Sequence, residues 1–360
     1  MAKQTPIYVI FDGGNSLWKS VIFGDDIKRR EIVIPHAIIE DEGGTRFQSV
    51  QSRFAGDLKN FDREWLKFGE QSFVVGNSAE AEGVVTRKTG SAKYTNDYYG
   101  VSLMAILLAA MPQGHNNIHV YASFPPGDNA YVRDLTDSIL GKWSVETTAA
   151  VVVNYHIRSV QPYDEPLGGY ICASCDPQGI PYKDSHLDKG STLVVDVGGK
   201  VSSVMRVLQG GRVQYGNAKS IDIGIQDVVS LFTESLKRMH PELKGLRSFN
   251  DDIIRRALAT GRYQFKGDEL DCAESVRKAT NTIINRLSTF YTNDFAGGAN
   301  DNQILVTGGG GGALFHLLDE AFQHKRMFTA ERPDAMHLAN VRGGERICRL
   351  ALLTARKAQS

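Results

Sequence analysis

The stretch FDGGNSLWK, residues 11–19, follows the apolar segment IYVI and decides how the beginning of this chain folds. We expect a strand over 7–11 that ends at Asp12, a turn at two glycines, and a second strand over 18–23. Glycines let backbone N–H groups approach an anion without side-chain obstruction. Asp12 would offer oxygen to a hydrated Mg²⁺, and Lys19 would point back toward the same turn. A single turn of this kind is also an everyday structural hairpin.

The same arrangement returns at residues 191–203, which read STLVVDVGGKVSS. An apolar strand over 191–195 ends at Asp196, glycines follow at 198 and 199, and another strand is expected over 201–208. Two such units are much less expected by chance than one. They indicate an internal duplication in which a nucleoside triphosphate is clamped between two hairpins.

A third glycine turn follows the expected strand QILVT at 303–307, where residues 308–312 are all glycine. A helix is expected directly afterwards, over 313–322. A strand, a glycine turn and a helix N-terminus together accept a phosphate, a ribose or a base edge closely, and a flexible loop is the plain alternative. The pattern G-x-x-x-x-G-K-[ST] does not occur, which excludes a P-loop.

Other segments give expectations about the rest of the fold. Helices are expected over 98–111, 131–140 and 339–357, and the region 225–290 is expected to be largely helical. A short strand at 157–161 should stop at Pro162, because proline cannot donate to a sheet. Met104, Leu107 and Leu108 lie in the apolar run 101–111, which is too short to span a bilayer and indicates a buried helix.

The bulk composition bounds the class of protein. The chain has 360 residues, of which 42% are hydrophobic and 23% charged, as in ordinary globular proteins of about two domains. The formal net charge is zero, so no global basic field attracts nucleic acid, and any DNA contact should run through an adaptor. The N-terminus lacks the pattern of a signal peptide. We therefore expect a cytoplasmic protein with no membrane contact.

Cys172 and Cys175 form a lone CxxC, while Cys272 and Cys348 are isolated. A zinc site needs a second pair or histidines at ligand spacing, and His186 is a poor candidate. A redox motif would belong to a thioredoxin-like unit, which the pattern does not indicate. Small buried core residues are the favoured interpretation, and a metal or redox role is the alternative.

These motifs together resemble the superfamily of actin, sugar kinases and DnaK-type chaperones. FDGGNSLWK resembles its first phosphate motif, VVDVGGKVSS its second, and ILVTGGGGGAL its adenosine motif, in the expected order. The segments WLKFGEQSFVVGNSA, KYTNDYYGVSLMAILLAA and HLANVRGGERICRL are similar to the ParM/StbA group of plasmid-segregation actins. Some archaeal actin homologues share this pattern.

The resemblance implies an α/β fold of duplicated actin-like (ribonuclease H-like) domains with a nucleotide cleft between them. Domain I would comprise residues 1–175 and 338–360, with a smaller subdomain inserted at about 34–92. Domain II would comprise residues 176–337, with a smaller subdomain inserted at about 217–275.

The resemblance also implies the site. SVQPYDEPLGGY resembles the connecting segment in which an acid or amide positions the attacking water, so Glu165 joins Asp12 and Asp196 as a catalytic candidate; a surface Glu in a loop is the plain reading. Asp12 and Asp196 would hold Mg²⁺ through water. The expected ligand is ATP, or GTP. Its binding residues would be Gly13, Gly14, Asn15, Ser16, Lys19, Gly198, Gly199, Lys200, Gly308, Gly309, Gly310 and Gly311.

One departure concerns the second phosphate motif, which usually carries threonines and then an acid. Here the sequence reads Lys200, Val201, Ser202, Ser203. Lys200 would either add positive charge beside a phosphate or point to solvent. This segment puts the hydrolysis rate and the metal geometry in doubt.

The implied function is an ATPase whose nucleotide state governs assembly into filaments that segregate plasmid DNA through a DNA-binding adaptor. Head-to-tail contacts between copies generate such open filaments. The alternatives are a small-molecule kinase or a nucleotide-gated binding protein of the same superfamily. No sugar motif favours the kinase, and no β-rich peptide-binding domain follows the core as in a chaperone.

Overall fold

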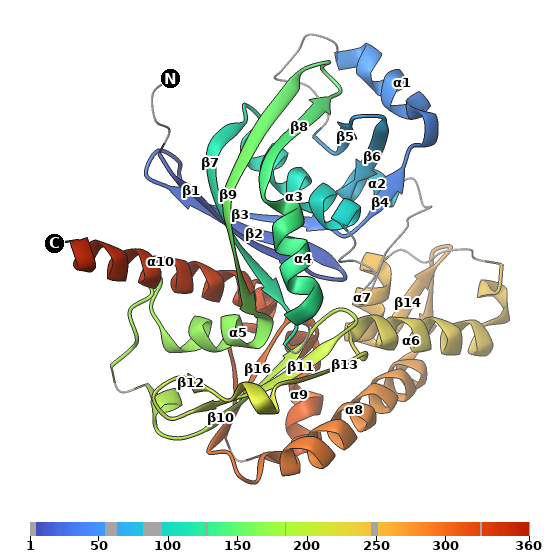
Figure 1. Ribbon diagram of the computed structural model, residues 1–360. Helices are drawn as coiled ribbons and strands as arrows, with labels where there is room; N and C mark the ends of the chain where they lie inside the picture. Colours follow the sequence, from blue (N-terminus) through green and yellow to red (C-terminus); the bar gives the residue numbers. More distant parts are fainter. Residues whose placement is uncertain are drawn as a thin grey trace.

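Within the described residues, which are 5–54, 63–81, 96–126, 129–183, 185–245, 251–324 and 326–359, nine strands of the computed structural model form one curled sheet (Figure 1). Its order is β3-β2-β1-β7-β9-β8-β5-β6-β4. The strands are β1 (Ile7–Gly13), β2 (Leu17–Gly24), β3 (Arg30–Pro35), β4 (Ile38–Glu40), β5 (Trp65–Phe68), β6 (Gln71–Val75), β7 (His115–Phe124), β8 (Gly141–Thr147) and β9 (Val152–Asp164).

A second sheet contains six strands among the described residues and has the order β12-β11-β10-β16-β17, with β13 beside β11. The strands are β10 (Thr192–Val197), β11 (Ser202–Leu208), β12 (Arg212–Val213), β13 (Lys219–Ile221), β16 (Gln303–Thr307) and β17 (Met327–Thr329). Figure 1 shows this sheet in the lower half of the molecule, below the larger sheet.

The two sheets repeat one arrangement, as the sequence predicts. In the first, β1 forms an antiparallel hairpin with β2 and runs parallel to β7. In the second, β10 forms an antiparallel hairpin with β11 and runs parallel to β16. Because parallel strands end at the same edge, the turns after β1 and β10 lie at the carboxyl edges of their sheets, where α/β proteins bind ligands.

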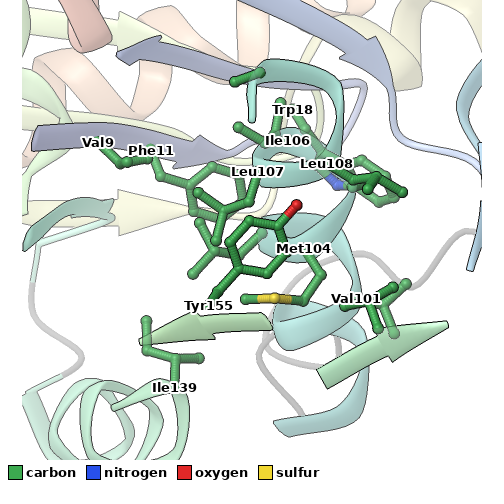
Figure 2. Packing of buried hydrophobic residues seen from close by; sticks show 14 of the residues in the cluster. Val9, Phe11, Trp18, Val101, Met104, Ile106, Leu107, Leu108, Ile139 and Tyr155 are labelled. Atoms are coloured by element: carbon green, nitrogen blue, oxygen red, sulfur yellow. The ribbon is translucent and has the colours of Figure 1, made fainter. Parts of the chain in front are cut away.

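The helices cover these sheets. They are α1 (Thr45–Phe54), α2 (Gly76–Ala81), α3 (Asn96–Ala110), α4 (Asn129–Ile139), α5 (Glu165–Ser174), α6 (Ile225–Met239), α7 (Asp251–Thr260), α8 (Ala273–Phe295), α9 (Gly309–Phe322) and α10 (Ala339–Gln359). Helix α3 is apolar on nearly every side because it lies inside the first half. Met104, Leu107 and Leu108 are fully buried there, as predicted, and Figure 2 shows them gathered with Phe11 and Tyr155.

Helices α5 and α10 join the halves (Figure 1). Helix α10 contacts β1, β2 and β7 of the larger sheet, whereas α5 contacts β10, β11 and β16 of the smaller one. The two helices approach closely at glycines, since a Cβ added to Gly343 would lie 1.7 Å from the carbonyl oxygen of Gly168. This crossing places the C-terminal helix against the first half.

The observed end of strand β9 differs from the predicted end. The strand does not stop at Pro162 but continues to Asp164, with Pro162 opposite Ala122 of β7. Its other neighbour, β8, pairs with β9 only between Val152 and Ile157. Pro162 therefore lies where that edge of β9 has no β8 residue opposite, and a missing N–H is tolerated there.

The region 225–290 is not uniformly helical. A hairpin of β14 (Arg262–Phe265) and β15 (Asp268–Asp271) separates α7 from α8. Gly261 has φ of +70° and Gly267 has φ of +93°, conformations that glycine adopts readily. These two glycines end α7 and form the hairpin turn, and their spacing was the signal that the helical expectation missed.

Candidate functional site

A cavity of about 1040 Å³ lies between the two halves and collects most of the predicted site residues. The first hairpin, the second hairpin and the third glycine turn all reach its wall. Of the predicted residues, the lining contains Asp12, Gly14, Asn15, Ser16, Lys19, Glu165, Asp196, Gly198, Gly199, Gly308, Gly309 and Gly310. The volume is at the upper end of the range of small-molecule sites.

The first hairpin carries a buried ion pair. Asp12 and Lys19 are opposite each other in the β1–β2 register, and Lys19 Nζ lies 2.5 Å from Asp12 Oδ2. Their side chains are 2% and 11% exposed, so solvent screens the pair little. Burial alone would lower the pKa of Lys19. Asp12 outweighs that effect with help from Glu165 and Asp196, and the pKa is raised.

The aspartate of the second hairpin has a neutral partner instead of a lysine. The residue opposite Asp196 in the β10–β11 register is Ser203, not a lysine. Asp196 Oδ2 instead accepts a hydrogen bond of 2.8 Å from the Asn340 side-chain amide of α10, and Thr307 Oγ1 donates to Asn340 Oδ1 at 3.3 Å. Asn340 is 4% exposed, so this neutral group holds the buried carboxylate in place.

The third glycine turn brings the start of α9 against the second hairpin. The helix begins at Gly309, four residues before the predicted start, and only Gly308, with φ of +82°, lies in the turn. A Cβ on Gly308 would lie 2.1 Å from Asp196 Oδ1. The absence of side chains therefore lets the N-terminal amides of α9 reach the cavity wall, where the helix dipole favours an anion.

Glu165 is the first residue of α5 and not a loop residue, with Pro166 in the first turn where proline suits a helix. Its carboxylate belongs to the same electrostatic cluster as Lys19. Burial raises the pKa of Tyr99 well above its ordinary value, and Asp12 and Glu165 add to the rise. The phenol of Tyr99 therefore stays neutral beside the acids.

Three predicted residues do not line the cavity. A Cβ on Gly13 would lie 2.8 Å from the Tyr99 ring, and one on Gly311 would lie 2.8 Å from Val306, so both glycines permit close packing. Lys200 takes neither of the two expected positions. Its ammonium lies 2.5 Å from Asp227 Oδ1 of α6, while its side chain is 33% exposed.

Sequence reasoning missed many residues of the cavity lining, and two of them, Gln226 and Asn340, contact the predicted turns directly. Asn340 lies in the closing segment HLANVRGGERICRL, whose resemblance was a usable signal, although no role followed from it. Gln226 had no sequence signal, because it reaches the first hairpin only through the packing of α6.

None of the four cysteines is part of the cavity lining. Cys172 and Cys175 are buried, and burial raises the pKa of Cys172 to about 11. Across the described ranges, no group of three or more His, Cys, Asp or Glu side chains is arranged to hold a metal ion. The favoured interpretation as core residues agrees with this burial.

The residues of the cavity fit a nucleoside triphosphate with a hydrated divalent cation. Asp12, Glu165 and Asp196 gather on the wall with one ammonium, that of Lys19. A Mg²⁺ ion that keeps most of its waters needs only a few carboxylates together with phosphate oxygens. The glycine turns leave open backbone next to these acids. The donor set therefore suits a cation that arrives with a polyphosphate.

Comparison with known proteins identifies the fold. No protein-family model matches the chain, and the comparison with curated proteins gives no match. The solved structure of the archaeal actin homologue Ta0583 matches with a TM-score of 0.72 at 16% identity, covering 96% of this chain and 99% of that one. The chain has an actin-like fold. The resemblance and the α/β fold class inferred from the sequence are thereby confirmed.

Other actin-like structures match over nearly the whole chain. A ParM from Clostridium botulinum, solved as a 15-stranded filament, gives a TM-score of 0.70 at 17% identity and covers 96% of this chain and 100% of that one. ParM of Bacillus thuringiensis with ATP gives a TM-score of 0.66 at 13% identity and covers 98% of this chain and 100% of that one.

Within the described part of the chain, no helix has the length and apolar character needed to cross a membrane.

Proposed function

We propose that this chain is an ATPase of actin type that assembles into filaments in the cytoplasm and segregates plasmid or other DNA through an adaptor protein. The observation that carries the proposal is the meeting of three glycine turns, Lys19 and Glu165 on the wall of one cavity between duplicated halves. The ParM filament and the ATP-bound ParM among the structural neighbours support it.

The proposed roles follow from charge and position. Lys19 and the amides of the glycine turns bind the β- and γ-phosphates, with GTP as an alternative to ATP. Asp12 and Asp196 hold the waters of a Mg²⁺ ion, which supplies charge neutralisation when bound. Glu165 orients the water that attacks the γ-phosphate.

We assign residues 1–175 and 338–360 to the first domain and residues 176–337 to the second, with α5 and α10 between them. Closing of the two domains on the triphosphate selects the conformation that assembles, and hydrolysis loosens it. The proposed contacts between copies are head-to-tail, because head-to-tail contacts that do not close into a ring build an open filament. The net charge of zero agrees with DNA contact through an adaptor.

High-speed sedimentation tests the proposal. The protein is centrifuged with Mg-ATP, Mg-GTP, Mg-ADP and a non-hydrolysable ATP analogue, beside Glu165→Ala. We expect pelleting with triphosphate for both proteins, and phosphate release that falls by about 10²-fold or more in the variant. Protein that binds nucleotide but never pellets over a wide concentration range would contradict filament assembly. Unchanged phosphate release in the variant would contradict the role of Glu165.

A further inference from the structure

The N-terminus of α6 touches both phosphate hairpins. Gln226 Nε2 donates to the carbonyl oxygen of Asn15 at 2.9 Å and to Ser16 Oγ at 3.0 Å, which lie in the turn of the first hairpin. The backbone N–H of Gln226 donates to the carbonyl oxygen of Gly199 at 2.8 Å, in the turn of the second. One residue therefore ties together two turns that belong to different halves.

The turns are already close where Gln226 joins them. A Cβ on Gly199 would lie 2.5 Å from Ser16 Oγ and 3.2 Å from Ser16 N, so a larger residue would have to displace Ser16. Gly224, which precedes α6, is equally tight, since a Cβ there would lie 2.5 Å from the carbonyl oxygen of Gly199. Small displacements of α6 would therefore change the spacing between the hairpins.

Lys200 fixes the helix that carries Gln226. The Asp227 carboxylate receives Lys200 Nζ at Oδ1 (2.5 Å) and the Gly224 N–H at Oδ2 (2.9 Å). Both oxygens are thus used within the second hairpin and the start of α6. Lys200 lies outside the cavity lining, whereas Gln226, Asn15 and Ser16 belong to it. A direct contact of Lys200 with phosphate would require this pair to break.

We infer that Gln226 is a positioning residue that holds the first phosphate turn against the second, and that Lys200 acts on the nucleotide through Asp227 and α6 rather than by touching a phosphate. The inference rests on the proposed function, because it assigns a role toward the nucleotide of that same site. It also explains how a lysine fits at this place in the second motif. The ammonium orders the helix that closes the clamp.

The first test compares nucleotide affinity with turnover. Gln226→Ala should raise the Kd for Mg-ATP about five- to tenfold, as expected for two hydrogen bonds that align a site. Phosphate release at saturating Mg-ATP should stay within about twofold of wild type, because bound phosphate then holds both turns itself. The exposed Gln209→Ala, on the β11–β12 turn, is the matched control and should leave both values unchanged. Unchanged affinity for Gln226→Ala, or a collapse of saturated turnover, overturns the positioning role.

The second test is a double-mutant cycle with Lys200→Met and Asp227→Asn. If Lys200 acts through Asp227, each single variant should raise the Kd by a similar factor of about three, and the double variant should be no worse. Lys200→Arg, which can still reach the carboxylate, should restore affinity. A Lys200→Met loss that greatly exceeds the Asp227→Asn loss and adds to it overturns the inference, since it indicates direct phosphate contact.

A third measurement separates this inference from the proposed function. Amide hydrogen exchange over residues 13–16 is followed without nucleotide, and Gln226→Ala should exchange faster there than wild type and Gln209→Ala. Faster exchange in Gln226→Ala supports the positioning role of Gln226 even if wild-type protein binds no nucleotide. A lack of nucleotide binding would contradict only the proposed function. Equal exchange in the three proteins overturns the positioning role itself.

Discussion

The β1–β2 and β10–β11 hairpins share one backbone arrangement but differ in how their aspartates are paired. In the first, Asp12 faces Lys19 across the β1–β2 ladder, and the pair is almost fully buried. In the second, the position opposite Asp196 holds Ser203, and the carboxylate accepts a hydrogen bond from Asn340. The lysine of the second hairpin, Lys200, lies in the turn instead, where it pairs with Asp227.

Duplication of a backbone therefore does not duplicate its electrostatics. The first hairpin pairs its aspartate with its own lysine. The second holds its aspartate with a neutral amide, and its lysine pairs with Asp227 of α6. Under the proposed function, the first hairpin would bind phosphate and the second would hold the waters of the cation.

The largest expected effect is the difference in unfolding free energy between variants of Lys19 and Lys200. Lys19→Met leaves buried carboxylates without their ammonium and should cost about 3–5 kcal/mol of unfolding free energy. Lys200→Met breaks a partly exposed pair and should cost at most about 1 kcal/mol. Urea denaturation of both variants beside wild type measures the gap. Equal losses would show that the two hairpins do not differ in this way.

A smaller effect is expected at the amide that serves the second hairpin. Asn340→Ala removes a hydrogen bond to a buried carboxylate and should cost about 2 kcal/mol. Asn285→Ala, at an exposed position of α8, is the matched control and should stay within about 0.5 kcal/mol of wild type. Chemical denaturation distinguishes them. A variant as stable as wild type would mean that Asn340 does not support Asp196.

The smallest effect concerns Arg342 of α10, which contacts residues of both halves. It contacts Glu31 of β3 through two hydrogen bonds, at 2.9 and 3.0 Å, and Glu331 of the second half through one at 2.8 Å. The hydrogen bonds from Arg342, helped by one from Arg29 at 2.7 Å, lower the pKa of Glu31 to about 2 from 4.5 despite its partial burial. Because this pKa is depressed, the stabilisation is complete above about pH 4.5 and is lost as the pH falls toward 2.

Glu31→Gln should therefore cost about 1–2 kcal/mol at pH 6, after allowance for solvent screening, and its deficit should shrink as the pH falls through that window. Glu331→Gln, with one hydrogen bond, should cost less at pH 6. Unfolding free energies measured from pH 6 to 2 check both. A deficit for Glu31→Gln that is constant with pH would contradict the ion pair.

Features of the fold that depend on residues adjacent in sequence were predictable, whereas features that depend on distant contacts were not. The hairpins at Asp12 and Asp196 were predicted because strand, acid and glycines are adjacent in sequence. The β14–β15 hairpin was missed because the helical pattern around it outweighed the signals of Gly261 and Gly267. The start of α9 was placed too late because packing holds four glycines in a helix that their propensity disfavours.

The missed site residues depend on contacts between distant parts of the chain. Gln226 lies 211 residues from Asn15, and Asn340 lies 144 residues from Asp196. The ion pair of Lys200 could not be predicted for the same reason, since its partner Asp227 is on a helix that only the fold brings close. Local motifs identify the turns of this site, whereas the groups that align them are found only in the folded chain.

Titration calorimetry of ATP, with Mg²⁺ and with a chelator, compares wild-type protein with Asp196→Asn at the proposed site. We expect wild-type protein to bind Mg-ATP, and chelation to raise its Kd about tenfold or more. In Asp196→Asn, chelation should raise the Kd clearly less than in wild-type protein, because only Asp12 remains to hold the waters of the ion. Wild-type protein that binds no triphosphate, or a variant that keeps the full magnesium dependence, would contradict the proposed site.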